Sequence, residues 1–153
     1  MPNERFGLPW ETIEGWRADG LRLAATDGCF DILHAGHLRM LRWAASQADR
    51  LVVLLPDDAS VAAYKPGRPF TPLADRVELV SGLKPVDAVG HYRQSDLASL
   101  YSELLPDVLV NSPEWRGRVV GQAEVESGGG QVVFFPKFGG WSTTDLVSRI
   151  RNA

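Results

Sequence analysis

Two histidines, His34 and His37, lie three residues apart where a loop passes into a helix. The first N–H groups of a helix have no partners within it, and side chains three residues apart lie on the same face. Such an entrance attracts anions, and imidazole N–H groups can stabilise charge on phosphoryl oxygens during in-line attack. Gly36 lets a nucleotide approach the backbone because it carries no Cβ. The segment therefore predicts a reactive phosphate site.

A second candidate anion site precedes the last predicted helix, where Ser142, Thr143 and Thr144 follow one another. Hydroxyl groups and backbone N–H groups at a helix start bind phosphate oxygens. Serine and threonine are also common structural caps at helix starts. Together with the histidine pair, the three residues predict a site for the β and γ phosphates of a triphosphate, which leave as pyrophosphate.

Cations lie between these two sites along the chain, at Lys65, Arg68 and Arg76. Lys65 and Arg68 belong to a stiff loop that contains proline and glycine. We expect Lys65 to neutralise triphosphate charge, and Arg68 or Arg76 to hold a phosphate through two parallel hydrogen bonds. The alternative for each is a solvated surface charge.

Other chemistries use the same residues. Zinc ligation by Cys29, His34 and His37, with Asp31 as a fourth donor, is an alternative, but the sequence has no second cluster of cysteine or histidine to support it. A dinucleotide fingerprint needs glycines spaced G-x-G-x-x-G, which this loop does not supply. We therefore expect no protein-bound metal and no dinucleotide.

Short apolar runs alternate with segments of helical spacing, which predicts an α/β fold. We expect a Rossmann-like, doubly wound, five-stranded parallel sheet with helices on both faces. In such sheets ligands bind beyond the carboxyl ends of the strands, where the candidate residues lie. The predicted strands are 21–25, 51–55, 88–91, 108–110 and 131–135, and the predicted helices are 11–18, 38–45, 73–83, 97–104, 119–126 and 143–151.

Length and composition set the general class. The 153 residues are 44% hydrophobic and predict one domain, 1–153, with residues 1–20 as an N-terminal helical extension. A net charge of −3 argues against nucleic acid as a partner, and no apolar run approaches the roughly 20 residues of a membrane span. One cysteine and no signal-like N-terminus predict a cytoplasmic protein. Exposed tryptophans Trp10, Trp16 and Trp43 would either form a dimer surface or cover the core.

The segment from Gly28 to His37 resembles the signature of the cytidylyltransferase-like nucleotidyltransferases. Within that superfamily the chain is most similar to the adenylyltransferase domain of ADP-heptose synthases. Segments 65–76 and 118–130 and the residues Gly140-Trp141-Ser142-Thr143-Thr144 carry this closer resemblance, which covers about residues 21–151. The nucleotide-binding residues expected from it are Gly28, Cys29, Phe30, Asp31, Gly36, Asn111, Trp115, Ser142, Thr143 and Thr144.

The resemblance implies transfer of a nucleotidyl group from a nucleoside triphosphate to a sugar 1-phosphate, without a covalent enzyme intermediate. ATP is the favoured donor, a heptose 1-phosphate the favoured acceptor, and Mg²⁺ accompanies the triphosphate. His34 and His37 would stabilise the transition state, and Lys65 would contact phosphate. The resemblance also favours a homodimer. No heptose kinase sequence is present, so another protein would have to make a heptose phosphate substrate.

The chain departs from its closest family pattern at two places. It has Thr26-Asp27-Gly28 where Thr-Asn-Gly is usual, and Asn111-Ser112-Pro113-Glu114-Trp115 where Lys-Gly-Gly-Asp-Tyr is usual. Both changes lower local positive charge. They leave two alternatives open, which are a cytidylyltransferase acting on a polyol phosphate such as glycerol 3-phosphate and a nucleotide-binding module without turnover. Trp115 is expected to stack on a base or to pack in its loop. The residues expected to contact the acceptor are Asp27, Arg68, Arg76 and Glu114.

Overall fold

A five-stranded sheet forms the centre of the computed structural model, which describes residues 5–136 and 142–153. Its order is β3-β2-β1-β4-β5, and all neighbouring strands are parallel. The fold-class prediction is confirmed. The strands are Leu23–Asp27 (β1), Arg50–Pro56 (β2), Ala88–Tyr92 (β3), Val108–Asn111 (β4) and Gln131–Phe134 (β5).

Strand β1 lies two residues later than predicted. The backbone N–H of Leu21 still donates to the carbonyl of Trp16, at the end of the preceding helix, so pairing with β2 and β4 can begin only afterwards. Asp27, which the sequence pattern left in a loop, is therefore the last residue of the central strand.

Seven α-helices lie within the described residues, and six of them match predicted segments. The exception is α3, in a stretch predicted as loop. Asp57 caps this helix by accepting the Ser60 N–H at 2.9 Å. The helices are Trp10–Ala18 (α1), Ala35–Ala45 (α2), Asp58–Tyr64 (α3), Leu73–Ser81 (α4), Leu97–Leu104 (α5), Gln122–Ser127 (α6) and Thr143–Arg151 (α7).

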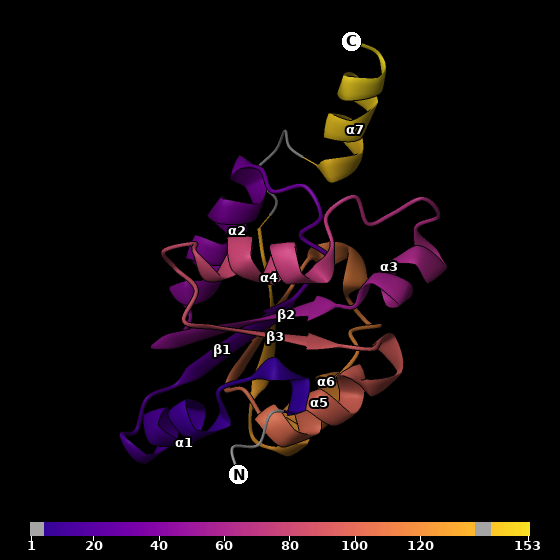
Figure 1. Ribbon diagram of the computed structural model, residues 1–153. Helices are drawn as coiled ribbons and strands as arrows, with labels where there is room; N and C mark the ends of the chain where they lie inside the picture. The colour runs from indigo at the N-terminus through magenta and orange to yellow at the C-terminus, as the bar shows by residue number, and fades with distance from the viewer. Residues whose placement is uncertain (1–4, 137–141) are drawn as a thin grey trace.

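Helices cover both faces of the sheet (Figure 1). Helices α1, α5 and α6 pack on one face and α2 and α4 on the other, each against its own cluster of buried side chains. Trp10 is buried in the first cluster, Trp16 packs against it, and Trp43 packs against the second. Of the two alternatives for these tryptophans, the structure shows that they cover the core.

The chain winds in two directions from β1. It runs outward through β2 to β3, then crosses to β4 and β5 on the other side. The switch point of the sheet therefore lies between β1 and β4, beyond Asp27 and Asn111, where ligands bind in such folds. Within the described ranges, no helix is both long and apolar enough to cross a lipid bilayer.

Candidate active site

The entrance of α2 is built from its two histidines. His34 is the N-cap residue, with extended backbone, and its Nδ1 accepts the Gly36 N–H at 3.1 Å. The N–H of His34 donates in turn to Nδ1 of His37 at 3.3 Å. The two rings are stacked with their centroids 3.9 Å apart. Each imidazole thus serves the helix start through Nδ1.

This capping arrangement fixes the tautomer of both rings. A ring nitrogen that accepts an N–H carries no proton, so the neutral imidazole has its proton on Nε2. Burial lowers the pKa of His34. Burial, with the charges of His34 and Lys65, lowers the pKa of His37 to about 4. At neutral pH both rings are uncharged, and in each the ring proton is on Nε2.

The entrance of α7 meets the entrance of α2. The hydroxyl of Ser142 accepts the Asp145 N–H at 3.0 Å, so Ser142 is the N-cap, as predicted. The hydroxyl oxygen of Thr143 lies 3.4 Å from Nε2 of His34. Thr144 is exposed on the first turn. The starts of α2 and α7, 109 residues apart in the chain, thus lie side by side. Gly140 and Trp141, which belong to the segment with the closer family resemblance, lie outside the described residues.

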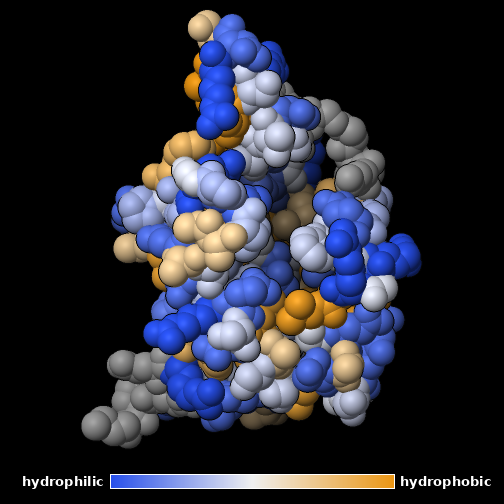
Figure 2. Space-filling model, turned by 90° about the vertical axis from the view of Figure 1, so that its right-hand side faces the viewer, coloured by the Kyte–Doolittle hydropathy of each residue, from blue (hydrophilic) through white to orange (hydrophobic). Residues whose placement is uncertain are grey.

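Beside these entrances, a cavity of about 430 Å³ opens at the carboxyl ends of β1, β3 and β4. Figure 2 looks onto this side of the molecule, which is hollowed near its centre, with hydrophobic atoms among hydrophilic ones. The two histidines lie at α2, outside the cavity lining. Six predicted site residues line it: Asp27, Gly28, Cys29, Lys65, Asn111 and Trp115.

Sequence reasoning missed the other residues of the cavity wall. Tyr92 and Gln94 lie within three residues of the end of the predicted strand 88–91, and the rule that ligands bind beyond strand ends would have found them. Tyr64 adjoins the predicted Lys65 and was missed because the site in this segment was predicted from its positive charges alone. The complete set of unpredicted lining residues is Thr26, Met40, Tyr64, Tyr92, Gln94, Leu97, Ser112, Val119 and Val120.

Asp27 has a buried partner below the cavity. Its Oδ2 accepts the hydroxyl of Tyr101 at 2.6 Å, and Tyr101 is fully buried on α5. Burial raises the pKa of Asp27 to about 6, against the opposing effect of the Tyr101 hydrogen bond. A carboxyl group at this switch point is thus held in position and is harder to ionise than in water.

Asp31 and Arg68 bind each other. The buried Asp31 carboxylate accepts Nε of Arg68 and the backbone N–H groups of Phe70 and Thr71. Burial alone would raise the pKa of Asp31, but these hydrogen bonds hold it below its ordinary value. Neither side chain belongs to the cavity lining. The pair ties the loop 65–72, between α3 and α4, to the loop 28–34, between β1 and α2. The nucleotide contact of Asp31 and the acceptor contact of Arg68 stay predictions.

Arg76 differs from its prediction. It is fully buried, and its guanidinium donates to the carbonyls of Thr71, Cys29 and Pro56 and to the carboxylate of Asp58. A side chain with no exposed surface cannot hold an incoming phosphate. Its place at the start of α4 makes it a connector of three loops beneath the site.

The remaining predicted residues have mixed placements. Phe30 is buried and its ring lies 5.1 Å from that of His37, so it supports the histidine pair. Asn111 accepts the Ser112 N–H through its own side chain. Trp115 is 46% exposed at the cavity edge, with the Arg118 guanidinium 4.8 Å from its ring. Glu114 is exposed and outside the lining.

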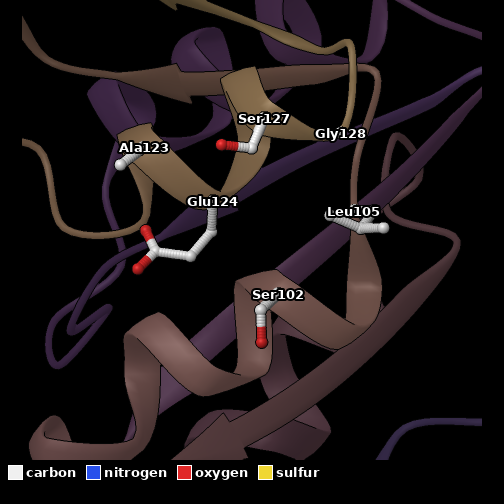
Figure 3. Close-up of a pocket in the computed structure, with 6 residues that line it drawn as sticks. All are labelled: Ser102, Leu105, Ala123, Glu124, Ser127 and Gly128. Carbon is white, nitrogen blue, oxygen red and sulfur yellow. The ribbon is translucent and has the colours of Figure 1, made fainter.

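Two further features bear on the chemistry. Across residues 5–136 and 142–153, no three histidine, cysteine, aspartate or glutamate side chains are grouped as a metal site requires. A second hollow, of about 450 Å³, lies between α5 and α6 and contains no predicted site residue (Figure 3). Its charged lining residue is Glu124, whose carboxylate would repel phosphate.

A doubly wound parallel sheet with two converging helix entrances and a cavity at its switch point is an arrangement in which α/β proteins bind phosphorylated ligands. A family model described as "Cytidylyltransferase-like" matches residues 25–120. The chain belongs to this family, which confirms the predicted superfamily, and the match together with the relatives below indicates a nucleotidyltransferase.

The similar proteins agree with this assignment. The chain is 45% identical over 145 residues to the "Bifunctional protein HldE" of Gluconacetobacter diazotrophicus, covering 94% of the chain and 30% of that protein. It is 44% identical over 138 residues to the HldE of Halorhodospira halophila, covering 89% of the chain and 29% of that protein. The chain thus spans less than a third of these relatives. The predicted similarity to the adenylyltransferase domain of ADP-heptose synthases is confirmed.

A solved structure supports the fold. The "lipopolysaccharide core biosynthesis protein" of Thermoplasma volcanium superposes with a TM-score of 0.66 at 26% identity. The match covers 78% of this chain and 100% of that one.

Proposed function

We propose that the chain transfers a nucleoside monophosphate from a nucleoside triphosphate, with ATP as the favoured donor, to a heptose 1-phosphate-like sugar 1-phosphate. A phosphate oxygen of the acceptor attacks the α-phosphorus in line, the bond to the bridging oxygen breaks, and pyrophosphate leaves. The products are a nucleotide sugar and pyrophosphate. The similarity to HldE proteins supports the choice of acceptor class.

The observation that carries the proposal is the paired capping of α2. His34 and His37 use Nδ1 for the helix and so direct their donor capacity to Nε2. Two neutral N–H donors held in place can stabilise charge that builds on the α-phosphoryl oxygens without reorganising. The neutral rings act here as hydrogen-bond donors, and the proposed transfer needs no protonation of the phosphate.

The leaving group and its cation fit the neighbouring residues. Thr143 adjoins His34 at the start of α7, a helix entrance that favours pyrophosphate charge. Lys65, on the cavity wall, adds a positive charge close enough to lower the pKa of His37. Mg²⁺ enters as part of the triphosphate substrate, since this ion keeps several waters and binds mainly through substrate phosphates.

The test is a matrix of four nucleoside triphosphates against sugar 1-phosphates and polyol phosphates, followed by pyrophosphate release. We expect release only with both substrates present, and the highest kcat/KM with ATP and a heptose 1-phosphate. Preference for CTP with glycerol 3-phosphate would replace the substrate assignment with the polyol alternative. Tight triphosphate binding without release for any pair would instead indicate a binding module.

A further inference from the structure

The cavity beside the histidines has opposite electrostatic character at its two ends. Towards α2 it has Lys65, whose positive charge lies close enough to His37 to lower the pKa of that ring. At the end of β1 it has the carboxyl group of Asp27. A phosphate is attracted to the first end and repelled by an ionised carboxylate at the second. These charges therefore favour one direction for a phosphorylated ligand in this cavity.

The orientation of the Asp27 carboxyl is set from below. Tyr101 is fully buried, and Oδ2 of Asp27 is the acceptor of its hydroxyl at 2.6 Å. The Tyr101 ring is itself closely enclosed, since a Cβ on Gly121 would lie 2.3 Å from its Cδ2. Because Oδ2 accepts the Tyr101 hydroxyl, Oδ1 is the oxygen of Asp27 that can accept a hydrogen bond from a ligand in the cavity.

The neighbours of Asp27 leave its charge available to a ligand. The ion pairs among the described residues are Arg5–Glu103, Arg68–Asp31 and Arg76–Asp58, so no arginine or lysine of those ranges neutralises Asp27. The surrounding wall is largely apolar and aromatic, with Tyr92, Leu97 and Val119. An oxygen that only accepts, at an apolar wall, selects a ligand group that donates.

We propose that Asp27, positioned by Tyr101, determines acceptor specificity by accepting a hydrogen bond from a hydroxyl group of the phosphorylated acceptor. This inference rests on the proposed function. It orients the acceptor with its phosphate towards His34 and His37 and its hydroxyl-bearing body towards β1. Tyr101 acts through Asp27 and is a positioning residue.

The decisive experiment compares a heptose 1-phosphate with its monodeoxy analogues, using wild type and Asp27→Asn. The amide keeps the size of the side chain, and its oxygen can still accept the Tyr101 hydroxyl, which turns the NH₂ donor towards the cavity. For wild type we expect one deoxy analogue to lose about 10- to 100-fold in kcat/KM, the range of a hydrogen bond to a charged group. Asp27→Asn should lose a similar factor on the parent sugar and distinguish the two sugars by less than about threefold.

Two further variants separate specificity from structure. Tyr101→Phe should raise KM for the acceptor while leaving KM for ATP within about twofold. Asp87→Asn makes the same exchange at the opposite end of the sheet, where Asp87 accepts the Leu51 N–H, and should leave sugar discrimination intact. A change in ATP KM with unchanged sugar discrimination in Asp27→Asn would overturn the inference, because Asp27 would then contact the nucleotide.

A binding measurement keeps this inference distinct from the proposed function. If wild type releases no pyrophosphate with any acceptor, the proposed function fails. Calorimetric titration of the same heptose 1-phosphate and deoxy analogues, with a non-hydrolysable ATP analogue present, then tests Asp27 directly. Weaker binding of one deoxy analogue to wild type, lost in Asp27→Asn, supports the inference, and equal binding throughout overturns it.

Discussion

The backbone N–H of His34 donates to Nδ1 of His37, while the ring of His34 accepts the N–H of Gly36. Each of the two residues that we propose as catalytic groups therefore also takes part in the cap of α2. The cap holds the rings 3.9 Å apart and keeps Nε2 protonated in each. In each ring Nδ1 serves the helix start, and Nε2 carries the proposed chemistry.

Removing either imidazole should slow catalysis much more than it weakens the fold. For His34→Ala and His37→Ala we expect kcat to fall about 10²- to 10³-fold, as when one preorganised donor is lost. The free energy of unfolding should fall by only about 1 kcal/mol, the value of a helix cap. Steady-state kinetics and urea unfolding measure the two effects.

The third histidine provides the matched control. His91 is exposed on β3, and His91→Ala should keep wild-type kcat. The double variant at His34 and His37 should lose less than the product of the two single losses, since each ring orients the other. Full turnover in the double variant would refute the proposed mechanism.

Asp31 is expected to act on stability before it acts on nucleotide binding. Asp31→Ala leaves Arg68 and two backbone N–H groups without their acceptor, which should lower the free energy of unfolding by about 2–4 kcal/mol. Urea unfolding measures the loss, and the exposed Asp19→Ala is the control, expected to change stability by less than about 0.5 kcal/mol. A stable Asp31→Ala protein with a raised KM for ATP would show instead that Asp31 binds nucleotide.

A pair of glycines tests how tightly Tyr101 is held. Gly121 and Gly129 both have a φ of +89°, but a Cβ at Gly121 would lie 2.3 Å from the Tyr101 ring. A Cβ at Gly129 would have no atom of the described residues within 4 Å apart from its own chain neighbours. Both Gly→Ala variants bear the cost of a left-handed alanine, about 1–2 kcal/mol. We expect Gly121→Ala to lose at least about 1 kcal/mol more in thermal unfolding, from overpacking. Equal losses would mean that the Tyr101 ring moves freely.

The raised pKa of Asp27 predicts a specific dependence of stability on pH. The Asp27 carboxyl keeps its proton up to about pH 6 in the folded protein but only to about pH 3.8 in the unfolded chain. The stability that this group contributes is therefore lost as the pH rises from about 3.8 to about 6. The free energy of unfolding of Asp27→Asn, relative to that of wild type, should therefore increase by about 1–3 kcal/mol between pH 4 and pH 7. Urea unfolding of both proteins at several pH values measures this difference.

Other groups do not obscure the comparison. Tyr64, Tyr92 and Tyr101 face Asp27, and burial raises their pKa values further above the window. His37, with its lowered pKa, makes stability rise with pH between about 4 and 6.5, but it does so in both proteins and cancels. If the difference in free energy of unfolding between the two proteins did not change with pH, that result would contradict the buried position of Asp27.

Local features of the chain were readable without the structure. The apolar runs gave five strands, and the histidine pair with Gly36 marked a helix entrance, because both signals depend on neighbours within a few residues. Helix α3 was missed although its Asp57 cap is also local. The prolines and glycine that follow it favoured a loop, and that part of the segment is indeed a loop.

Long-range contacts decided the rest. Sequence alone determined the fold class, the helix entrance at His34 and the capping role of Ser142, since spacing and residue type suffice for each. Only the tertiary structure showed that Arg68 and Arg76 bind protein groups, that Tyr101 lies beneath Asp27, and that the start of α7 lies beside His34. A charge or hydroxyl has the same sequence signature whether it meets solvent, ligand or a buried partner. The difference depends on which distant segment folds against it.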